Sequence, residues 1–134
     1  MSIEHQRFRG LIREPLRGML DDGAAMAVSE YDAAYRRLRE CETRVDAAFD
    51  GVDALLVPAA PGEAPEVATT GDPIFNRAWS ALGVPAVTVP AGLGPSGLPL
   101  GVQIVGPPRQ DARVLACAAW VEAALARTME RAFV

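Results

Sequence analysis

Lysine is absent from this chain, whose thirteen basic residues are all arginine. This absence excludes a nucleotide-binding P-loop, because that motif needs a lysine to contact the phosphates. It also excludes a lysine general base, and arginine is no substitute because its guanidinium does not lose a proton in proteins. The arginine bias by itself is equally well explained by a GC-rich genome, which favours arginine codons.

Histidine and cysteine are almost as scarce. The single histidine, His5, lies near the N-terminus, where we expect no Ser–His pair. The two cysteines, Cys41 and Cys117, are too few for a disulfide framework, and together with one histidine they are too few for a structural zinc site. We predict buried free thiols, no bound metal ion and no cofactor.

Charge and hydropathy restrict the partners and the compartment. The formal net charge is −4, whereas nucleic-acid-binding proteins normally carry a basic face, so we expect no nucleic-acid partner. The N-terminal residues lack the apolar core of a secretory signal. The long uncharged stretch over 83–108 is interrupted throughout by glycine and proline, which excludes a membrane helix. We expect a cytoplasmic protein with no membrane partner.

The pattern of apolar residues predicts an α/β fold. We expect a mixed β-sheet flanked by helices, within one domain over 1–134. Its predicted parts are an N-terminal amphipathic segment over 1–20, a long helix over 29–50, strands and a pocket loop over 52–106, and a C-terminal helix over 111–131. After a Pro/Gly/Ala-rich loop over 58–73, a short helix is expected with Asp72 as its cap and Pro73 at its first position, ending at Gly83. A loop of that length more often indicates function than a linker.

Residues 83–106 carry no charged side chain and contain short apolar runs, so we expect them inside a packed sheet. Gly92, Gly94 and Gly97 form a G-x-G-x-x-G pattern after a predicted strand. A dinucleotide site would need a helix directly after these glycines, but the sequence that follows is extended. We therefore interpret the pattern as a hairpin or crossover loop.

No local pattern assembles a catalytic group. The chain contains no G-x-S-x-G nucleophile elbow. Its serines are terminal, capping, helical or in a turn: Ser2, Ser29, Ser80 and Ser96. The scattered carboxylates show no spacing that suggests an acid–base pair: Asp53, Glu63, Glu66 and Asp72.

The order of several short motifs is distinctive. The chain contains D-x-L-L-x-P within GVDALLVPAAPGEAP, G-D-x-x-F-N-x-x-W followed by G-x-P-A-V-x-x-P within TTGDPIFNRAWSALGVPAVTVPAG, and G-L-P-x-G-x-Q within GLPLGVQIVGPP. In this order they resemble the C-terminal part of the amidase signature family, and the resemblance runs from about residue 16 to about residue 125. Each motif alone is weak, whereas their joint occurrence is specific. The resemblance implies that the mixed β-sheet is partial and that the domain over 1–134 is incomplete, as the C-terminal portion of the amidase signature fold.

The resemblance implies hydrolysis of an amide C–N bond through an acyl-enzyme. Members of the family use a nucleophilic serine, a bridging serine that relays a proton and a lysine base, while backbone N–H groups stabilise the oxyanion. These residues lie in the N-terminal portion of the family and have no counterpart here. We therefore expect the chain to be inactive alone and to need a complementary N-terminal amidase chain. A small-molecule amide substrate would bind only to the complete enzyme.

By position, the resemblance places this chain on the acyl-binding side of the substrate pocket. The candidate pocket residues are Thr70, Phe75, Asn76 and Trp79, with Gln103 as a structural or pocket-edge amide. The alternative is a non-catalytic remnant, or an interaction module that pairs with itself or with another protein. In both cases the strand edges and apolar faces predict self-association as a homo-oligomer.

Overall fold

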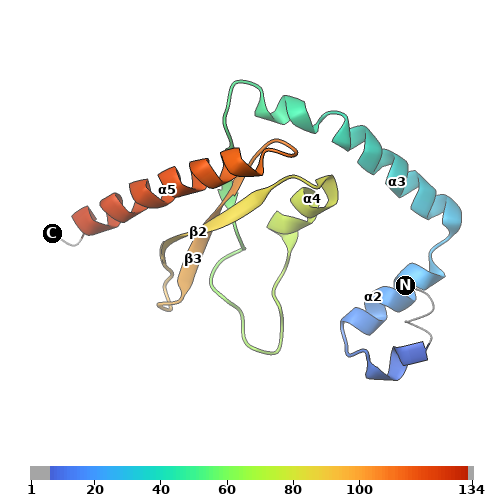
Figure 1. Cartoon of the computed structure of the whole chain (residues 1–134). Coiled ribbons are helices and arrows are strands. Elements are labelled where there is room, and N and C mark those ends of the chain that lie inside the picture. The colour runs from blue at the N-terminus through green and yellow to red at the C-terminus, as the bar shows by residue number, and fades with distance from the viewer. Residues whose placement is uncertain (1–6, 133–134) are drawn as a thin grey trace. The chain divides into compact units, whose positions relative to one another are not determined.

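The computed structural model describes residues 7–132, with side chains described as far as residue 128 (Figure 1). His5 lies outside the described residues. The described chain divides into two compact units, which meet in sequence between Arg39 and Glu40. The second unit combines helices with a three-stranded sheet, so the predicted α/β fold class is confirmed. Among the described strands both pairings are antiparallel, so the sheet is not mixed as expected. The single domain over 1–134 stays a prediction.

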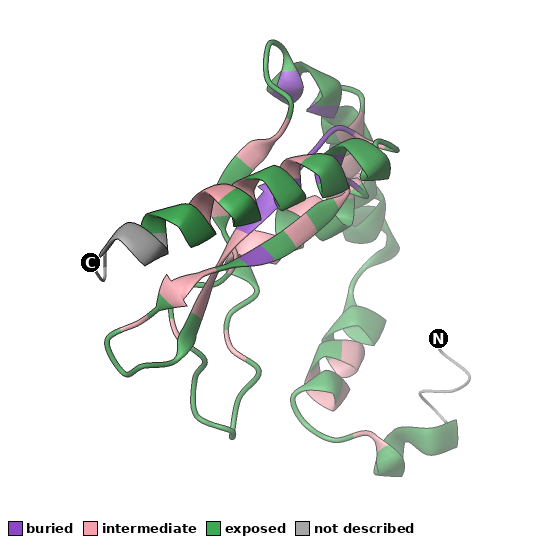
Figure 2. Cartoon of the chain, turned by 60° about the vertical axis from the view of Figure 1, so that its left-hand side comes forward, coloured by how far each residue is buried: buried purple, intermediate pink, exposed green. Residues whose placement is uncertain are grey.

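The first unit contains η1 (Arg9–Leu11), α2 (Leu16–Ala25) and most of α3 (Val28–Glu42). α2 begins directly after Pro15, so the amphipathic segment predicted over 1–20 is divided at this proline. No residue from 7 to 39 is buried (Figure 2). The helices of this unit therefore enclose no apolar core among the described residues.

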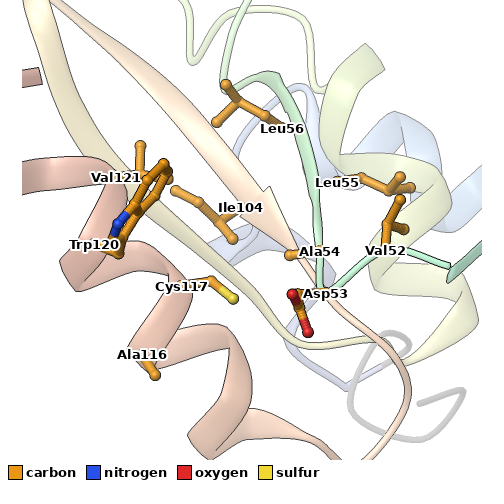
Figure 3. Close-up of a pocket in the computed structure, with 10 residues that line it drawn as sticks. All are labelled: Val52, Asp53, Ala54, Leu55, Leu56, Ile104, Ala116, Cys117, Trp120 and Val121. Atoms are coloured by element: carbon orange, nitrogen blue, oxygen red, sulfur yellow. The ribbon is translucent and has the colours of Figure 1, made fainter. Parts of the chain in front are cut away.

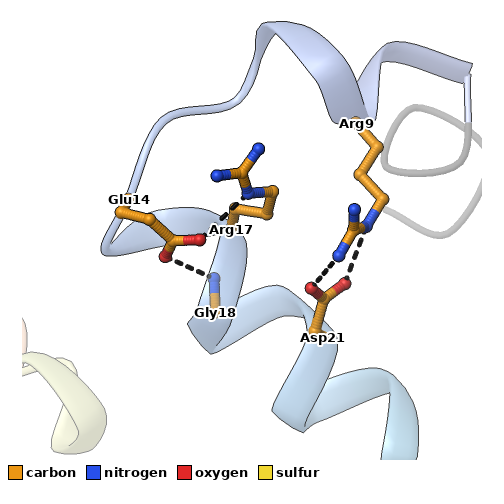
Figure 4. A network of polar contacts seen from close by, with 5 residues as sticks. All are labelled: Arg9, Glu14, Arg17, Gly18 and Asp21. Carbon is orange, nitrogen blue, oxygen red and sulfur yellow. Dashed lines mark hydrogen bonds and ion pairs between the residues drawn. The ribbon is translucent and has the colours of Figure 1, made fainter.

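In the first unit, polar contacts connect η1 with α2, and the residue before Pro15 with the first turn of α2 (Figure 4). The Arg9 guanidinium donates hydrogen bonds to the two carboxylate oxygens of Asp21 at 3.2 and 2.5 Å. Glu14 accepts hydrogen bonds from Arg17 at 2.9 Å and from the Gly18 N–H at 3.1 Å, and these contacts, the Arg17 one first, lower the pKa of Glu14. Exposed ion pairs contribute little to stability, so we expect this unit to open readily.

The long helix predicted over 29–50 is interrupted in the structure. α3 ends at Glu42, and a separate 3-10 helix, η2 (Val45–Phe49), follows it. After α3 the Thr43 hydroxyl donates a hydrogen bond to the Glu40 carbonyl at 2.8 Å. The backbone tightens there into i→i+3 hydrogen bonds. Periodicity did not reveal this break because the apolar spacing continues through it.

Both cysteines are free thiols, as predicted, but the expected burial was wrong. Cys41 is exposed on α3, a helix that contributes no buried residue. Cys117 is half-buried on α5 (Asp111–Ala132).

The sheet consists of β1 (Leu55–Pro58), β2 (Ala86–Leu93) and β3 (Pro99–Val105), in the order β1-β3-β2. β2 and β3 form an antiparallel hairpin, so the hairpin interpretation of the glycine pattern is confirmed. Gly97 has a φ of 79°, a conformation that suits glycine, and its N–H donates to the Gly94 carbonyl at 3.0 Å. The glycines thus serve a tight turn.

β3 is the central strand and is covered on both faces. Alternation along the strand sends Ile104 and Val105 to opposite faces, and both side chains are almost completely buried. One face carries a cluster formed with η2 and the end of α4 (Ile74–Leu82): Val45, Phe49, Val84 and Val105. The other face carries a cluster formed with α5: Val89, Ile104, Val114 and Ala118. This double coverage explains the near-continuous apolar run.

α5 lies across the sheet and is held close to it at its N-terminal end (Figure 1). The Arg113 guanidinium donates to the Asp53 carboxylate at 2.5 Å, just before β1. A Cβ at Gly106 would overlap a methyl carbon of Val114, so the glycine permits the close approach of the helix. Neither α5 nor any other helix within residues 7–132 has the length and apolar character needed to cross a membrane.

The sheet exposes apolar surface at its margins. Within the described chain, β1 and β2 each pair only with β3, so each has one outer edge without a strand partner. Leu56 on β1 is 61% exposed and Trp120 on α5 is 69% exposed. Unpaired edges beside exposed apolar side chains promote association with another polypeptide.

We therefore expect the chain to self-associate at micromolar concentration. Leu56→Glu should shift its mass, measured by size-exclusion chromatography with light scattering, toward that of the monomer. Val67→Glu is the matched control, because Val67 is a fully exposed apolar residue of the loop after β1 and should leave the distribution unchanged. A wild-type chain that elutes only as a monomer would contradict this expectation.

Candidate functional site

Two of the predicted pocket residues meet in the second unit. Gln103 Nε2 on β3 donates a hydrogen bond to Asn76 Oδ1 on α4 at 2.7 Å. Asn76 Nδ2 in turn donates to the main-chain carbonyl of Ala59 at 3.1 Å. This series of hydrogen bonds joins the central strand, the first turn of α4 and the start of the loop between β1 and α4 (residues 59–73, the β1–α4 loop).

The local sequence explains why α4 presents Asn76 to the sheet. The helix begins after Pro73, whose carbonyl accepts a hydrogen bond from the Asn76 N–H at 2.8 Å. It ends at Gly83, which has a φ of 62° and donates its N–H to carbonyls of the last turn. Gly83 thus ends the helix as predicted, whereas the expected Asp72 cap was wrong, because Pro73 is the N-cap and no side chain caps the first turn.

Gln103 is a polar residue in an apolar strand, and its side chain is only 6% exposed. Leaving a buried polar group without a partner costs about 1–3 kcal/mol. The contact with Asn76 satisfies the Nε2 group, whereas Oε1 has no hydrogen-bond partner among the described residues. The Nε2 group of Gln103 therefore donates its hydrogen bond to Asn76 within the protein and does not point into an open pocket.

The other predicted pocket residues lie apart from this amide pair. Thr70 is exposed on the β1–α4 loop, and Phe75 is half-buried in the first turn of α4. Trp79 is half-buried and packs against the cluster that contains Val105. None of these three side chains takes part in the described hydrogen bonds between Asn76 and Gln103.

Glu63 is a further residue of this region, which sequence reasoning did not assign to the site. Its Oε1 atom accepts a hydrogen bond from the Ser96 N–H at 2.8 Å and another from the Leu98 N–H at 3.2 Å. These N–H groups belong to the turn between β2 and β3. The sequence carries no local signal for this contact, because the partners are more than thirty residues apart.

The contact between Glu63 and Ser96 does not favour a role as nucleophile and base. Hydrogen bonds from the Ser96 side chain, followed by the backbone N–H groups, lower the pKa of Glu63 against an opposing effect of partial desolvation. A carboxylate whose pKa is lowered is a poorer base, and its oxygen is already occupied by N–H donors. Within the part of the chain that the structure describes, no cluster of three His, Cys, Asp or Glu residues could hold a metal ion.

An apolar groove of about 700 Å³ lies on the α5 face of the sheet (Figure 3). It runs between β1 and α5 and is lined by Val52, Asp53, Ala54, Leu55, Leu56, Ile104, Ala116, Cys117, Trp120 and Val121. Ile104 and Gln103 point to opposite faces, so this groove is separate from the amide pair. Its apolar lining suits packing against another apolar surface better than recognition of a polar amide.

Comparison with known proteins places these observations in a family. The Amidase family model matches residues 3–115. A glutamyl-tRNA(Gln) amidotransferase subunit of Methylorubrum extorquens (strain PA1) is 33% identical over 138 residues, an alignment that covers 92% of this chain and 28% of that protein. The corresponding protein of Maricaulis maris (strain MCS10) is 31% identical, over 90% of this chain and 27% of that protein.

Solved structures give the same assignment. The crystal structure of an amidase matches with a TM-score of 0.80 and 28% identity, over 91% of this chain and 31% of that chain. A second match is a structure from a vestigial protein complex connected with the evolutionary origins of an s-triazine catabolic enzyme. It has a TM-score of 0.69 and 27% identity, over 85% of this chain and 30% of that chain. The architecture is therefore that of an amidase-type α/β protein.

This chain belongs to the amidase family, as its motifs suggested. It spans less than a third of the length of the relatives described above.

Asn76→Ala should lower the free energy of unfolding by about 1–3 kcal/mol, because it leaves the buried Gln103 donor without its partner. Chemical denaturation followed by circular dichroism measures this change. Ser80→Ala is the control, since it places the same residue type at an exposed position of the same helix and should have little effect. Equal stability of the Asn76→Ala variant and the wild type would show that the amide pair does not support the fold.

Proposed function

We propose that this chain forms the substrate-pocket part of an amide-hydrolysing enzyme, and that it acts together with polypeptide carrying the nucleophile and the base. The observation that carries the proposal is the family match over residues 3–115 in a chain that has no lysine. The family resemblance implies a lysine base, and arginine cannot supply one. The coverage of 28% of a relative's length is consistent with catalytic groups outside this chain.

The β1–α4 loop and the first turn of α4 would line the acyl side of the pocket. Thr70 and Phe75 have exposed surface with which to contact a substrate. Asn76 and Gln103 are engaged with each other, so we assign them the role of fixing α4 and the loop. Trp79 packs into the core beneath the helix and would support the pocket from behind.

The complementary polypeptide would cover the apolar surface at the margins of the sheet. Two observations support this arrangement: the free edge of β1 and the apolar groove between β1 and α5. Added strand pairing would satisfy the N–H and C=O groups of that edge, and burial of Leu56 and Trp120 would contribute hydrophobic stabilisation. The covering polypeptide would be either another part of a longer chain or a separate protein.

The chain alone should release no ammonia from simple carboxamides above the blank. Co-expression with the part of an amidase relative that this chain does not cover should produce hydrolysis, and substitution of the lysine base in that part by alanine should abolish it. Ammonia release from the purified complex measures both outcomes. Turnover by the isolated chain that survives repurification and is lost in Ser80→Ala or Ser96→Ala would overturn the proposal.

A second function is favoured by the same exposed surfaces. A non-catalytic module that pairs with itself would use Leu56, Trp120 and the groove as its interface. A stable homo-oligomer that cannot be displaced by the complementary amidase portion would favour this alternative. Displacement accompanied by amide hydrolysis would favour the enzyme.

A further inference from the structure

The β1–α4 loop is held at its start and at a point further along. At its start, the Ala59 carbonyl accepts the hydrogen bond from Asn76. Further along, Glu63 reaches the turn between β2 and β3. Between Glu63 and α4 the loop residues are almost all exposed, Thr70 among them. The Glu63 contact therefore ties the loop to the turn between β2 and β3, at a second position beyond Ala59.

The hairpin turn is shaped to receive this carboxylate. The turn closes on itself through hydrogen bonds from the Gly94 N–H to the Leu98 carbonyl at 2.8 Å and from the Gly97 N–H to the Gly94 carbonyl at 3.0 Å. The N–H groups of Ser96 and Leu98 remain and both point to one oxygen of Glu63. An ionised carboxylate is a stronger acceptor for such donors than a neutral group.

Gly94 provides the space in which the Glu63 side chain lies. A Cβ at Gly94 would overlap the Oε1, Cγ and Cδ atoms of Glu63. No side chain can occupy that position while Glu63 stays in place. The packing at Gly94 and the two hydrogen bonds therefore describe one placement of the Glu63 side chain against the turn.

We propose that Glu63 is a positioning residue whose ionised carboxylate fastens the β1–α4 loop to the β2–β3 turn and so sets the shape of the substrate-side loop. The part of this statement that concerns substrate rests on the proposed amidase function. The fastening itself rests only on the contacts of Glu63 with the turn. Protonation of Glu63 removes the charge that strengthens both hydrogen bonds, and the loop is then released.

The pH at which release occurs follows from the direction of the shift. Hydrogen bonds, with the Ser96 side chain first, hold the pKa of Glu63 below its ordinary value of 4.5 in the folded chain. The stabilisation is therefore present at neutral pH and is lost as the pH falls through the lowered pKa. The turn over 94–98 carries no titratable side chain, and on the loop the other acidic residues are Glu66 and Asp72.

The test compares two ways of breaking the contact. Glu63→Gln keeps the size and shape of the side chain and removes its negative charge. Gly94→Ala places a methyl group in the space that the Glu63 carboxylate occupies and so displaces it. Both variants should increase hydrogen exchange of the Ser96 and Leu98 amides about tenfold or more, and should speed proteolysis within the β1–α4 loop. Far-UV circular dichroism establishes that each variant retains the fold. Because the two substitutions break the contact by different means, the same change in both variants assigns it to the loss of the contact.

Matched controls are available on the same loop. Glu66→Gln removes a neighbouring exposed carboxylate that makes no described contact with the turn. Gly62→Ala places a methyl group where no atom lies within 4 Å. Neither control should change exchange at Ser96 or Leu98. In the wild type, the amide chemical shifts of these two residues should titrate below pH 4.5, and this titration should be absent in Glu63→Gln.

The possible outcomes distinguish a failure of the proposed Glu63 contact from a failure of the proposed amidase function. Unchanged exchange in both Glu63→Gln and Gly94→Ala overturns the proposal, whatever the activity. In the reconstituted amidase, Glu63→Gln should raise KM several-fold with a smaller effect on kcat, and an unchanged KM despite a released loop overturns the substrate part. If reconstitution yields no hydrolysis, the proposed function fails, while the exchange and titration results still decide whether Glu63 fastens the loop.

Discussion

The hydrogen bond between the Gln103 and Asn76 side chains holds the candidate site together. β3 is buried on both faces, so a polar side chain on this strand requires a partner from the element packed above it. Asn76 supplies that partner and passes the connection on to the Ala59 carbonyl. One buried amide therefore fixes the helix, the start of the loop and the central strand relative to each other.

The two faces of the sheet have different roles. On the face of α4, the amide pair fixes the start of a long exposed loop, and the contact of Glu63 with the hairpin turn holds the same loop further along. On the face of α5, the core is closed near Val114, but the groove beside β1 remains open and apolar. Both features agree with a chain that spans only part of its amidase relatives.

Much of the second unit could be predicted from sequence. The short helix before Gly83 could be predicted because proline favours a helix start and glycine a helix end, although the expected Asp72 cap was wrong. The C-terminal helix could be predicted because Asp111 precedes a long apolar repeat. The hairpin was recognised because the residues after its glycines are extended rather than helical. The break between α3 and η2 was missed, because it depends on a side chain that competes for backbone hydrogen bonds while the apolar spacing continues. Burial of Cys41 was also mispredicted, since helical periodicity does not show whether a face finds a packing partner.

Residue identities and their order along the chain are enough to indicate the family and to exclude a lysine base from this chain. The absence of lysine needs no structure to exclude a lysine base. The meeting of Gln103 with Asn76, and the reach of Glu63 to the turn at Ser96, became visible only in the folded chain. These partners lie 27 and 33 residues apart, and their contact is set by strand register and by the packing of α4 and the loop on the sheet, which no local pattern encodes.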